Sequence, residues 1–556
     1  MMLKSAANLW MLLFALLFMG SMMLGMAPGA VAEEASEAYS SPLEVVTLFA
    51  DNVIEHGRDR YGEEHTPLLV DGVNVDTREP VEWIHGGETW IPSNLASQQN
   101  LFRTLVALTN LTGDAKYREA AEEATAYHFD ELSRSCGLLQ WGGHRFIDLA
   151  TGNVVGEQDT HELKWSFPFY EFMWEVNPEA TERYLKAFWN AHISDWDLLD
   201  MNRHGPYGRE LGDLWDHPYS GAEPYMYASG LTFMNTGSDL MFAAAVLYDQ
   251  TGDDGPRRWA RRLMQRYVEA RNPRTHLGAY QYTQLNHNRD RALRRFGPDF
   301  PGQVVFEGTF LNTGAATGIY GRGAICQLRV AESFGEEGEE ITEWVREGLT
   351  AYAAHAYDSE TNTVSALMSD GTRLTNDDIK RHGYYGFNLD LSPSGVGSVT
   401  FFSYTLAYRM TEDEDLWEMV RGVARHHGLG DLGTAPGIGV DVNLDTNAHD
   451  AYFLLGLLEL CRATDHEDYV ALARQLADNI TDHHFHHGFF VPSPDHINAR
   501  FDAVEPLALL GLEAYLRGEP ELVPAYVGGR GFIHGPHDGY GRTTDNAVIW
   551  PQRRED

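Results

Sequence analysis

Residues 411–424 have the sequence TEDEDLWEMVRGVA, a short polar turn followed by an amphipathic helix. Thr411 and Asp413 are residues that cap the first turn of a helix, and the acidic residues after them suit the positive end of its dipole. Apolar residues then recur with the 3.6-residue period of a helix, at Trp417, Val420, Val423 and Ala424. The stretch therefore predicts a turn that joins two helices.

Similar turns, each followed by an early Tyr or Trp, occur at residues 111–114, 177–179, 251–253, 333–336 and 464–465. Their irregular spacing of roughly 50 to 80 residues favours a toroid over a thin solenoid. We predict an all-α fold, an (α/α) toroid of six to seven helical hairpins with loop insertions. Two unrelated helical domains are the alternative, but no Pro/Ser-rich linker divides the chain. Residues 33–556 are therefore predicted to form a single toroid domain.

Several segments lack helical periodicity. Residues 204–230 and 286–318 are rich in Gly, Pro, Tyr and Asn, and we expect them to form loops over one mouth of the toroid, where sites usually lie. Residues 66–99 are also irregular, and the Gly-rich residues 525–556 are predicted to hold no helix.

The N-terminal segment has the pattern of a secretory signal. Lys4 is followed by an apolar run over residues 9–26 and by Ala30-Val31-Ala32. We predict a signal peptide over residues 1–32, cleavage before Glu33, and a secreted or periplasmic location. The run is long for a signal, so an uncleaved membrane anchor is the alternative. No later segment is apolar enough to span a bilayer, and no stable membrane partner is expected.

The chain is strongly acidic, because 42 Lys and Arg stand against 81 Asp and Glu and give a net charge of −39. Only five of the basic residues are lysines. Such a surface suggests adaptation to high salt, where self-repulsion is screened, and it argues against nucleic acid as a partner. An anionic substrate would need a local cluster of positive charge. Neither a disulfide framework nor a zinc site is predicted from the scattered Cys136, Cys326 and Cys461.

Three short segments gather imidazole, carboxylate and guanidinium groups: Trp141-Gly142-Gly143-His144, His161-Glu162-Leu163-Lys164-Trp165 and Asn202-Arg203-His204-Gly205-Pro206-Tyr207-Gly208. Imidazole and carboxylate are common ligands of divalent transition ions, and an arginine beside such an ion suits an acidic substrate. His161 and Glu162 are adjacent, so their side chains diverge on a helix or a strand and only one is expected to face the site. Together the segments predict a metal-dependent enzyme that acts on an anionic compound.

These segments, their order and the toroid setting resemble the family 2 polysaccharide lyases over most of the chain. The segments are specific as a set and weak singly. The resemblance implies a pectate lyase that cleaves polygalacturonate or oligogalacturonides by metal-assisted β-elimination and leaves 4,5-unsaturated products. It implies Arg203 as the catalytic residue and His144, Glu162 and His204 as ligands of a divalent ion, with His161 as the alternative to Glu162. Manganese is the expected ion, and calcium or another divalent ion is the alternative.

β-Elimination from a uronate requires a base that removes the proton at C5 and a cation that stabilises the negative charge developing beside it. A free arginine is effectively always protonated. Arg203 can therefore be the base only if the ion and burial deprotonate it. Otherwise Arg203 binds the substrate carboxylate, and Tyr207 or His192 is the base.

Further substrate contacts are predicted from basic and aromatic residues, namely Lys164, Tyr207, Arg209, Arg289 and Arg291. The last two belong to a basic island with Arg294 and Arg295, and guanidinium forks match sugar carboxylates. The alternative for this island is a helix face paired with Asp290 and Asp299. Loop tyrosines are candidates for stacking on sugar rings: Tyr225, Tyr227, Tyr280 and Tyr282.

Three rival functions remain open. A glycoside hydrolase on the same scaffold, acting on uronyl oligosaccharides, would need acidic residues such as Asp239, Asp370 or Asp441. A lyase for another uronate polymer and a non-catalytic glycan-binding protein are the others. The histidine-rich run His483-His484-Phe485-His486-His487 is not predicted to be the site, because adjacent histidines cannot all point inward. The sequence makes no prediction of the oligomeric state.

Overall fold

The computed structural model describes residues 41–85, 87–142, 145–156, 159–197, 199–221, 234–278, 310–311, 316–378, 390–531 and 549–554. Residues 41–556 form one compact unit. The predicted signal peptide, residues 1–32, lies outside the described residues. Within the described ranges no helix is both long and apolar enough to cross a membrane.

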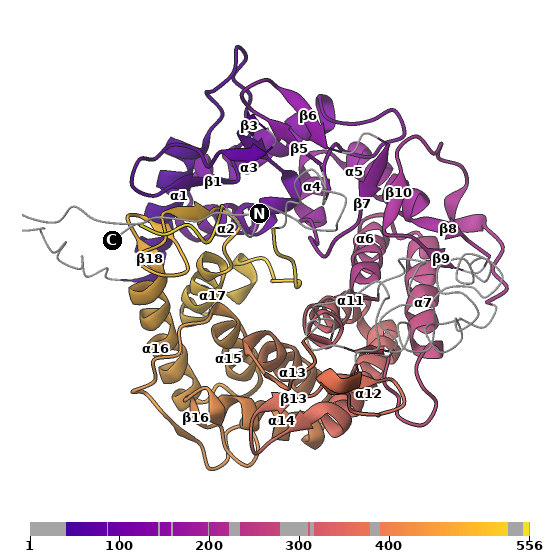
Figure 1. Cartoon of the computed structure of the whole chain (residues 1–556), viewed down its shortest axis with the longest axis vertical. Coiled ribbons are helices and arrows are strands. Elements are labelled where there is room, and N and C mark those ends of the chain that lie inside the picture. The colour runs from indigo at the N-terminus through magenta and orange to yellow at the C-terminus, as the bar shows by residue number, and fades with distance from the viewer. Residues whose placement is uncertain are drawn as a thin grey trace, which may run out of the picture. The chain divides into compact units, whose positions relative to one another are not determined.

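The helices of residues 41–556 stand in pairs around a ring (Figure 1). The pairs are α2 (Gln99–Thr112) with α3 (Ala115–Asp130), α4 (Tyr170–Val176) with α5 (Pro178–His192), α6 (Met234–Thr251) with α7 (Asp254–Glu269), α11 (Ala324–Phe334) with α12 (Glu339–Ala356), α13 (Ser398–Thr411) with α14 (Glu414–His426), and α15 (Ala451–Thr464) with α16 (Glu467–His484). The last helix, α17 (Glu505–Arg517), packs against the first, α1 (Pro42–Gly57). The predicted toroid of six to seven helical hairpins is confirmed.

One helix of each pair faces the middle of the ring. The inner helix α11 contacts α6 and α13, α15 contacts α13 and α17, and α17 contacts α2. The inner helices are buried around most of their circumference, as in α13, where every residue from Thr400 to Ala407 is buried. The outer helices are amphipathic, and α14 buries Trp417, Val420 and Val423 against the inner layer. The apolar core is therefore a cylinder between the two layers of helices.

The predicted turns fall between the paired helices, and most are capped as the sequence suggested. The side chains of Asp114, Asp253 and Asp413 accept hydrogen bonds from backbone amides in the first turn of α3, α7 and α14. Two turns differ from the prediction. Helix α12 follows Gly338 without a side-chain cap, and Asp465 ends α15 in a left-handed conformation (φ 50°), so that His466 caps α16 instead. The early aromatic residues of these outer helices are buried at Tyr117, Tyr184, Trp259, Trp417 and Tyr469.

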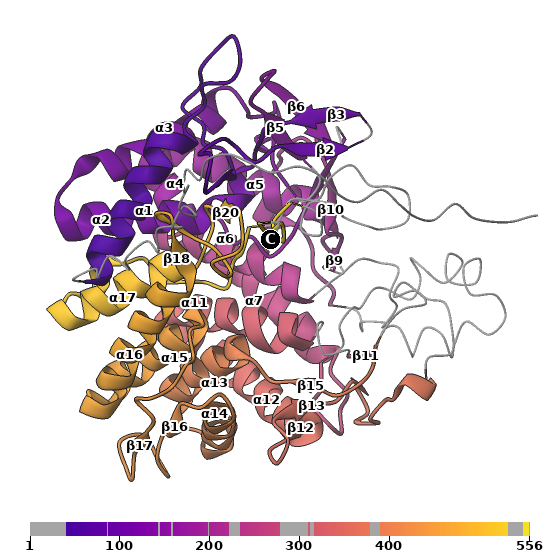
Figure 2. The same cartoon turned by 60° about the vertical axis from the view of Figure 1, so that its left-hand side comes forward.

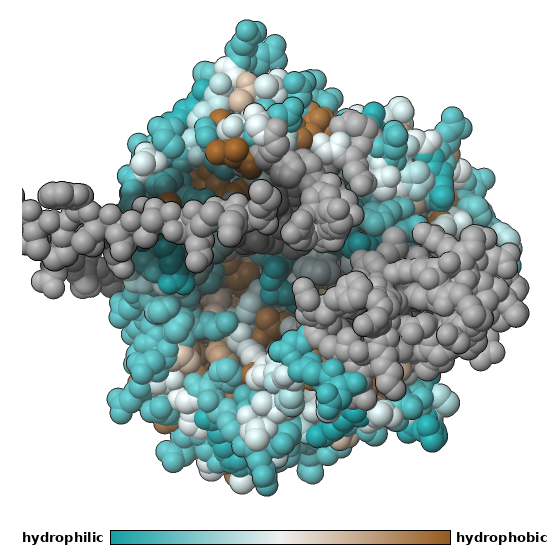
Figure 3. Space-filling model, viewed as in Figure 1, coloured by the Kyte–Doolittle hydropathy of each residue, from teal (hydrophilic) through white to brown (hydrophobic). Residues whose placement is uncertain are grey.

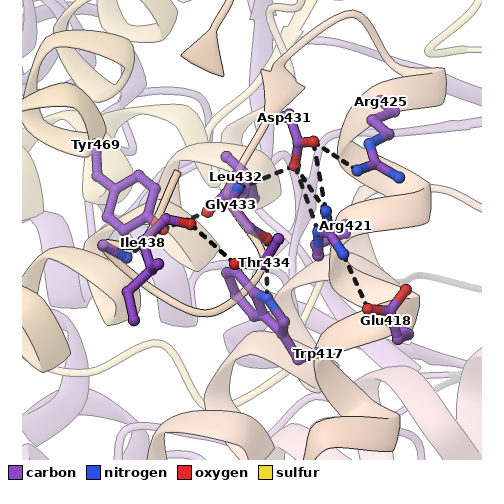
Figure 4. Close-up of polar contacts among 11 residues, drawn as sticks. Trp417, Glu418, Arg421, Arg425, Asp431, Leu432, Gly433, Thr434, Ile438 and Tyr469 are labelled. Atoms are coloured by element: carbon purple, nitrogen blue, oxygen red, sulfur yellow. Dashed lines mark hydrogen bonds and ion pairs between the residues drawn. The ribbon is translucent and has the colours of Figure 1, made fainter. Parts of the chain in front are cut away.

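The loop between α14 and α15, which joins two hairpins, is held by hydrogen bonds and ion pairs (Figure 4). Asp431 receives the guanidinium groups of Arg421 and Arg425, whereas Trp417 Nε1 donates to the Gly433 carbonyl at 3.1 Å. Tyr469 Oη donates to the Leu432 carbonyl at 2.6 Å. These contacts tie the loop to α14 and α16, so the loop is fixed at the outer edge of the ring, between the two helices.

Short antiparallel strands accompany the helices, and none in the described residues is longer than four residues. They are β1 (Gly72–Asn74), β2 (Trp83–His85), β3 (Glu88–Trp90), β4 (Pro92–Ser93), β5 (Arg145–Asp148), β6 (Asn153–Gly156), β7 (Thr160–Glu162), β8 (Ile193–Asp195), β9 (Asp200–Met201), β10 (His204–Pro206), β11 (Phe310–Leu311), β12 (Tyr357–Asp358), β13 (Thr363–Val364), β14 (Leu367–Met368), β15 (Ser394–Gly395), β16 (Gly430–Asp431), β17 (Asp441–Val442), β18 (Phe485–His486), β19 (Phe489–Phe490) and β20 (Asn498–Arg500). Figure 2 shows β2, β3, β9 and β10 on one side of the ring.

Two of the predicted irregular segments fit where they are described. Residues 66–99 hold β1 to β4, and the described parts of residues 525–556 hold no helix. Cys136, Cys326 and Cys461 are buried free thiols. Figure 3 shows a mostly hydrophilic outer surface with apolar patches in the hollow at the middle of the ring.

Candidate active site

The site is built on two paired strands, β7 and β10, and β10 packs against α5. Strand β7 pairs with β10 in an antiparallel register that sets His204 opposite Glu162 and Gly205 opposite His161. A hydrogen bond from the Leu163 amide to the Arg203 carbonyl, 2.7 Å long, continues the pairing. Gly205 is required here, because a Cβ atom would lie 2.9 Å from the carbonyl oxygen of Ala191 at the end of α5. The close approach of α5 therefore fixes the position of His204.

Glu162 is the centre of a cluster of positively charged and imidazole groups. Its side chain is 1% exposed, and its Oε1 atom lies 2.9 Å from Lys164 Nζ, 2.9 Å from Arg203 Nη1 and 3.3 Å from His204 Nε2. A buried carboxylate of this kind is stable only with such partners. The structure thus brings together Glu162, Lys164, Arg203 and His204, which the sequence proposed as site residues.

The side chain of His161 points to the opposite face of β7. Its ring packs edge-on against Trp141, with ring centroids 4.8 Å apart, and its Nδ1 lies 2.8 Å from His192 Nε2. His192 Nδ1 in turn lies 2.8 Å from the Asn202 carbonyl oxygen. Because a carbonyl only accepts, His192 carries its proton on Nδ1 and accepts from His161 Nδ1. Of the two adjacent candidates, Glu162 is therefore the one that shares a face with His204.

The pKa values of this histidine pair fit a structural role. Burial is the main cause that lowers the pKa of His161 well below its ordinary value and that of His192 to about 4. Both rings are then neutral at physiological pH. The pair links α5 to both strands of the site, since Asn202 also accepts the His204 amide on its Oδ1 at 2.9 Å. No local sequence pattern predicts this positioning role, although Trp141 and Asn202 both belong to the quoted segments.

Tyr207 and Arg209 turn their polar groups toward the backbone. Tyr207 Oη lies 3.0 Å from the carbonyl oxygens of Leu139 and Trp141, and burial raises the pKa of this phenol. The Arg209 guanidinium donates to the carbonyls of Asn190 and Ile193. Neither Tyr207 nor His192, the reserve candidates for the base, has its proton-accepting atom open to a ligand in this arrangement. The substrate-binding roles of Tyr207 and Arg209 stay predictions.

The Trp141-Gly142 segment approaches the same strands. Asn94 Nδ2 donates to the Gly142 carbonyl at 3.1 Å, and a Cβ atom at Gly142 would lie 3.3 Å from both the nitrogen and the oxygen of Glu162. Gly142 adopts a φ of 146°, so glycine suits this close approach. The third predicted ligand, His144, lies outside the described residues, as do Arg289, Arg291 and the loop tyrosines at 225, 227, 280 and 282.

The donor atoms present fit a divalent ion. Glu162 Oε1 and His204 Nε2 are 3.3 Å apart, which suits two ligands of one ion that each lie roughly 2.1 Å from it. Carboxylate and imidazole are also the ligand types that a first-row divalent ion prefers. Lys164 and Arg203, at the same carboxylate, supply positive charge that an anionic substrate would meet.

A second group of histidines is less suited to a metal. One ring nitrogen from each of His449, His483 and His484 lies within 4.8 Å of the other two. However, the rings of His449 and His483 stack with centroids 3.7 Å apart, so their in-plane lone pairs do not converge. Both nitrogens of His484 face backbone carbonyls, of Val491 at 3.0 Å and of His449 at 3.1 Å. The geometry agrees with leaving this run out of the predicted site.

The carboxylates needed by a hydrolase are not gathered. Asp239 is 0% exposed and accepts hydrogen bonds from Tyr170 Oη at 2.8 Å and the Phe167 amide at 3.2 Å. Asp370 and Asp441 are exposed residues elsewhere on the ring. The described residues therefore offer no pair of acids at the positions that this rival named.

Comparison with known proteins decides between these possibilities. The family model described as periplasmic pectate lyase matches residues 66–536. The chain belongs to the periplasmic pectate lyase family. As a member of this family it is a polysaccharide lyase that degrades pectate, and its substrate is an acidic polysaccharide. The matched range includes all the site segments described above.

A curated relative and two solved structures complete the comparison for this pectate lyase. A pectate disaccharide-lyase of Dickeya dadantii (strain 3937) is 33% identical over 520 residues, which cover 88% of this chain and 92% of the relative. An inactive variant of an alpha-1,6-mannanase of Salegentibacter sp. HEL1_6 has a TM-score of 0.39 at 11% identity, over 86% of this chain and 100% of the other. A D-mannose isomerase has a TM-score of 0.42 at 13% identity, over 77% and 99%. Scores this low carry no functional argument.

Proposed function

We propose that this pectate lyase cleaves polygalacturonate or oligogalacturonides by metal-assisted β-elimination and leaves 4,5-unsaturated products. The observation that carries the proposal is the convergence of Lys164, Arg203 and His204 on the buried Glu162 carboxylate. We infer that a divalent ion, manganese in preference to calcium or another ion, is held by His144, Glu162 and His204. When bound, such an ion neutralises the uronate carboxylate and stabilises the charge that develops beside C5.

In this reaction the base takes the C5 proton, and the electron pair of that bond forms the C4–C5 double bond. The C4–O bond breaks, and the leaving oxygen gains a proton. Arg203 faces the reacting sugar in our proposal, because its guanidinium lies 2.9 Å from the Glu162 oxygen and its side chain is 15% exposed. Lys164, on the same carboxylate, provides a second positive charge for the substrate.

The product size and the location are also proposals. The 33% identical relative is named a pectate disaccharide-lyase, which favours release of an unsaturated disaccharide by this chain as well. The family is described as periplasmic, and the predicted signal peptide over residues 1–32 favours export to the periplasm or beyond.

The decisive experiment follows the ultraviolet absorbance of the unsaturated uronide during incubation with polygalacturonate. The protein is treated with chelator and then supplied with manganese or calcium, at moderate and at high salt. We expect absorbance to rise, to stop with chelator and to return with manganese. No rise with folded protein under any of these conditions would overturn the substrate, and other uronate polymers would be tested next.

The role of Arg203 is tested by Arg203→Lys. If Arg203 is the base, the variant loses nearly all turnover, because an ammonium group cannot replace a guanidine at that position. If Arg203 only holds the substrate carboxylate, kcat survives and KM rises. A variant with wild-type kcat and KM would remove Arg203 from the proposed mechanism.

A further inference from the structure

A second cluster of arginines lines a cavity of about 360 Å³ beside the C-terminal segment. Arg322 belongs to the π-helical turn before α11 (Thr317–Gly323), Arg500 ends β20, and Arg530 lies in the segment after α17. The same cavity is lined by the aromatic rings of Tyr452 and Trp550. Its size is that of a site for a small ligand or for one unit of a polymer.

Two of the three arginines are held by neutral partners. Arg322 Nη1 donates to Tyr526 Oη at 2.6 Å and to the Gly528 carbonyl at 3.2 Å, whereas the Arg500 guanidinium donates to the Gly531 carbonyl. Arg530 is exposed, and its side chain makes no hydrogen bond or ion pair with any described residue. None of the three forms an ion pair with a carboxylate of the described ranges, although the chain carries a net charge of −39.

The aromatic rings complete the walls. The Arg322 guanidinium lies over the ring of Tyr452 at 5.0 Å, and that of Arg500 over Trp550 at 5.2 Å. Cation–π contacts of this kind orient a guanidinium without neutralising its charge. Exposed parts of such rings are also surfaces on which the apolar face of a sugar ring packs.

Two carboxylates also line the cavity, Asp502 and Glu505. Asp502 Oδ1 accepts the Asn100 amide of α2 at 2.7 Å, and its Oδ2 faces Gly531, where a Cβ atom would lie 2.8 Å from it. Arg322, Arg500 and Arg530 line one cavity, so their positive charges repel one another, and an anion placed among them would relieve that repulsion.

The segment that carries Arg530 packs against the chain just after the candidate active site. The Arg530 amide lies 3.4 Å from the Trp165 carbonyl oxygen, and a Cβ atom at Gly529 would lie 2.3 Å from that of Ser166. Trp165 is three residues after Glu162, and three extended residues span at most about 11 Å. An oligosaccharide bound at Glu162 can therefore reach Arg530.

We propose that the Arg322–Arg500–Arg530 cavity is a substrate subsite that binds the carboxylate of a uronate unit remote from the bond that is cleaved. This inference rests on the proposed function, since it takes the same polyuronate as ligand. The exposed guanidinium of Arg530 forms a charge-assisted hydrogen bond with the carboxylate, and Arg322 and Arg500 provide the surrounding positive charge. The subsite offsets the repulsion between the acidic protein and its acidic substrate.

The test compares Arg530→Ala with Arg425→Ala, a matched control that removes an exposed arginine from the outer helix α14. KM and kcat are measured on polygalacturonate, and binding of trigalacturonate is measured by calorimetry on chelator-treated protein. We expect Arg530→Ala to raise KM and the Kd about tenfold, with little change in kcat. Arg425→Ala should leave all three values near wild type, and Arg530→Lys should recover part of the loss.

The outcomes separate the two proposals. If Arg530→Ala stays within twofold of an active wild type in KM and Kd, the subsite is overturned and the lyase function stands. If the wild type makes no unsaturated product but binds trigalacturonate through Arg530, the proposed reaction fails and the subsite stands. A wild type that neither cleaves nor binds the trimer overturns both.

Discussion

Glu162 and Glu459 are both buried carboxylates that face three basic side chains, yet they differ in construction. Glu459 on α15 binds Arg329 at 2.6 Å, Arg409 at 2.6 Å and Arg462 at 2.9 Å, so it joins the three inner helices α11, α13 and α15. Glu162 lies on a three-residue strand, and its partners are a lysine, an arginine and a histidine from two short segments.

The two clusters differ in the chemistry of the groups that face the carboxylate. The three guanidinium forks around Glu459 are always charged and satisfy both carboxylate oxygens, so the cluster acts as a permanent joint between hairpins. The Glu162 cluster includes an imidazole, which can be neutral and bind a metal through its nitrogen. The two carboxylates are similarly buried, and the Glu162 cluster differs in holding a histidine, which is why we propose it as the reactive site.

The largest effect is expected for Glu162→Gln. The neutral amide cannot hold a divalent ion as a carboxylate does, so turnover of polygalacturonate should fall at least about 100-fold. The assay is formation of unsaturated product at saturating manganese, with circular dichroism to show that the fold is kept. Turnover within tenfold of wild type would mean that Glu162, like Glu459, is only a structural residue.

For Glu459→Gln we expect the opposite pattern. Removing the carboxylate leaves partly buried arginines without their counter-charge, which should lower the free energy of unfolding by about 3 kcal/mol. The activity of the folded variant should stay within twofold of wild type. Urea denaturation measures the first quantity and the lyase assay the second. Glu332→Gln, in the same cluster but with a side chain 31% exposed, is the matched control and should cost less.

The pH dependence of stability sharpens the same contrast. Burial by itself raises the pKa of Glu459, but Arg329, Arg462 and Arg409 outweigh it and lower that pKa from 4.5 to about 2. The ionised carboxylate therefore stabilises the fold fully above pH 4.5, and this contribution is lost as the pH falls toward 2. The stability gap between wild type and Glu459→Gln should narrow between pH 6 and pH 3. A constant gap in denaturant titrations would contradict this reading of the cluster.

The smallest effect is expected at the rim of the Glu459 cluster. Arg462 has a side chain 33% exposed and pairs with Glu459 from the same helix, so Arg462→Ala should cost less than about 1 kcal/mol. The side chain of Arg329 is 11% exposed, so Arg329→Ala should lower the free energy of unfolding by more than Arg462→Ala. If thermal denaturation shows equal losses of stability for Arg462→Ala and Arg329→Ala, the exposure of an arginine does not predict its contribution.

The sequence predicts the hairpins well because their signals are local. An N-terminal capping aspartate and an early aromatic residue lie within about five positions of one another, as at Asp413 and Trp417, and both act within one turn of helix. The same reasoning fails at Asp465, because a left-handed residue can end one helix and pass the capping role to the next residue, His466.

The site is predictable only in part, because its geometry depends on strand register. Sequence identifies His161 and Glu162 as alternatives, but the pairing of β7 with β10 decides which of them faces His204. The cavity of Arg322, Arg500 and Arg530 has no local pattern at all, since its members come from distant parts of the chain. The Glu459 cluster cannot be predicted from sequence for the same reason, because three helices contribute to it.

The ring closes where the first and last helical elements meet. Helix α1 packs against α17, β1 pairs with β20, and the Asn100 amide donates to Asp502, 402 residues further along the chain. Contacts of such sequence separation carry a large loop-closure entropy and give the protein a high contact order, which slows folding. Each hairpin can fold locally, but the contact between α1 and α17 can form only after the C-terminal hairpins have folded. A circular permutant opened at the turn of residues 251–253 would move that final step to another pair of helices.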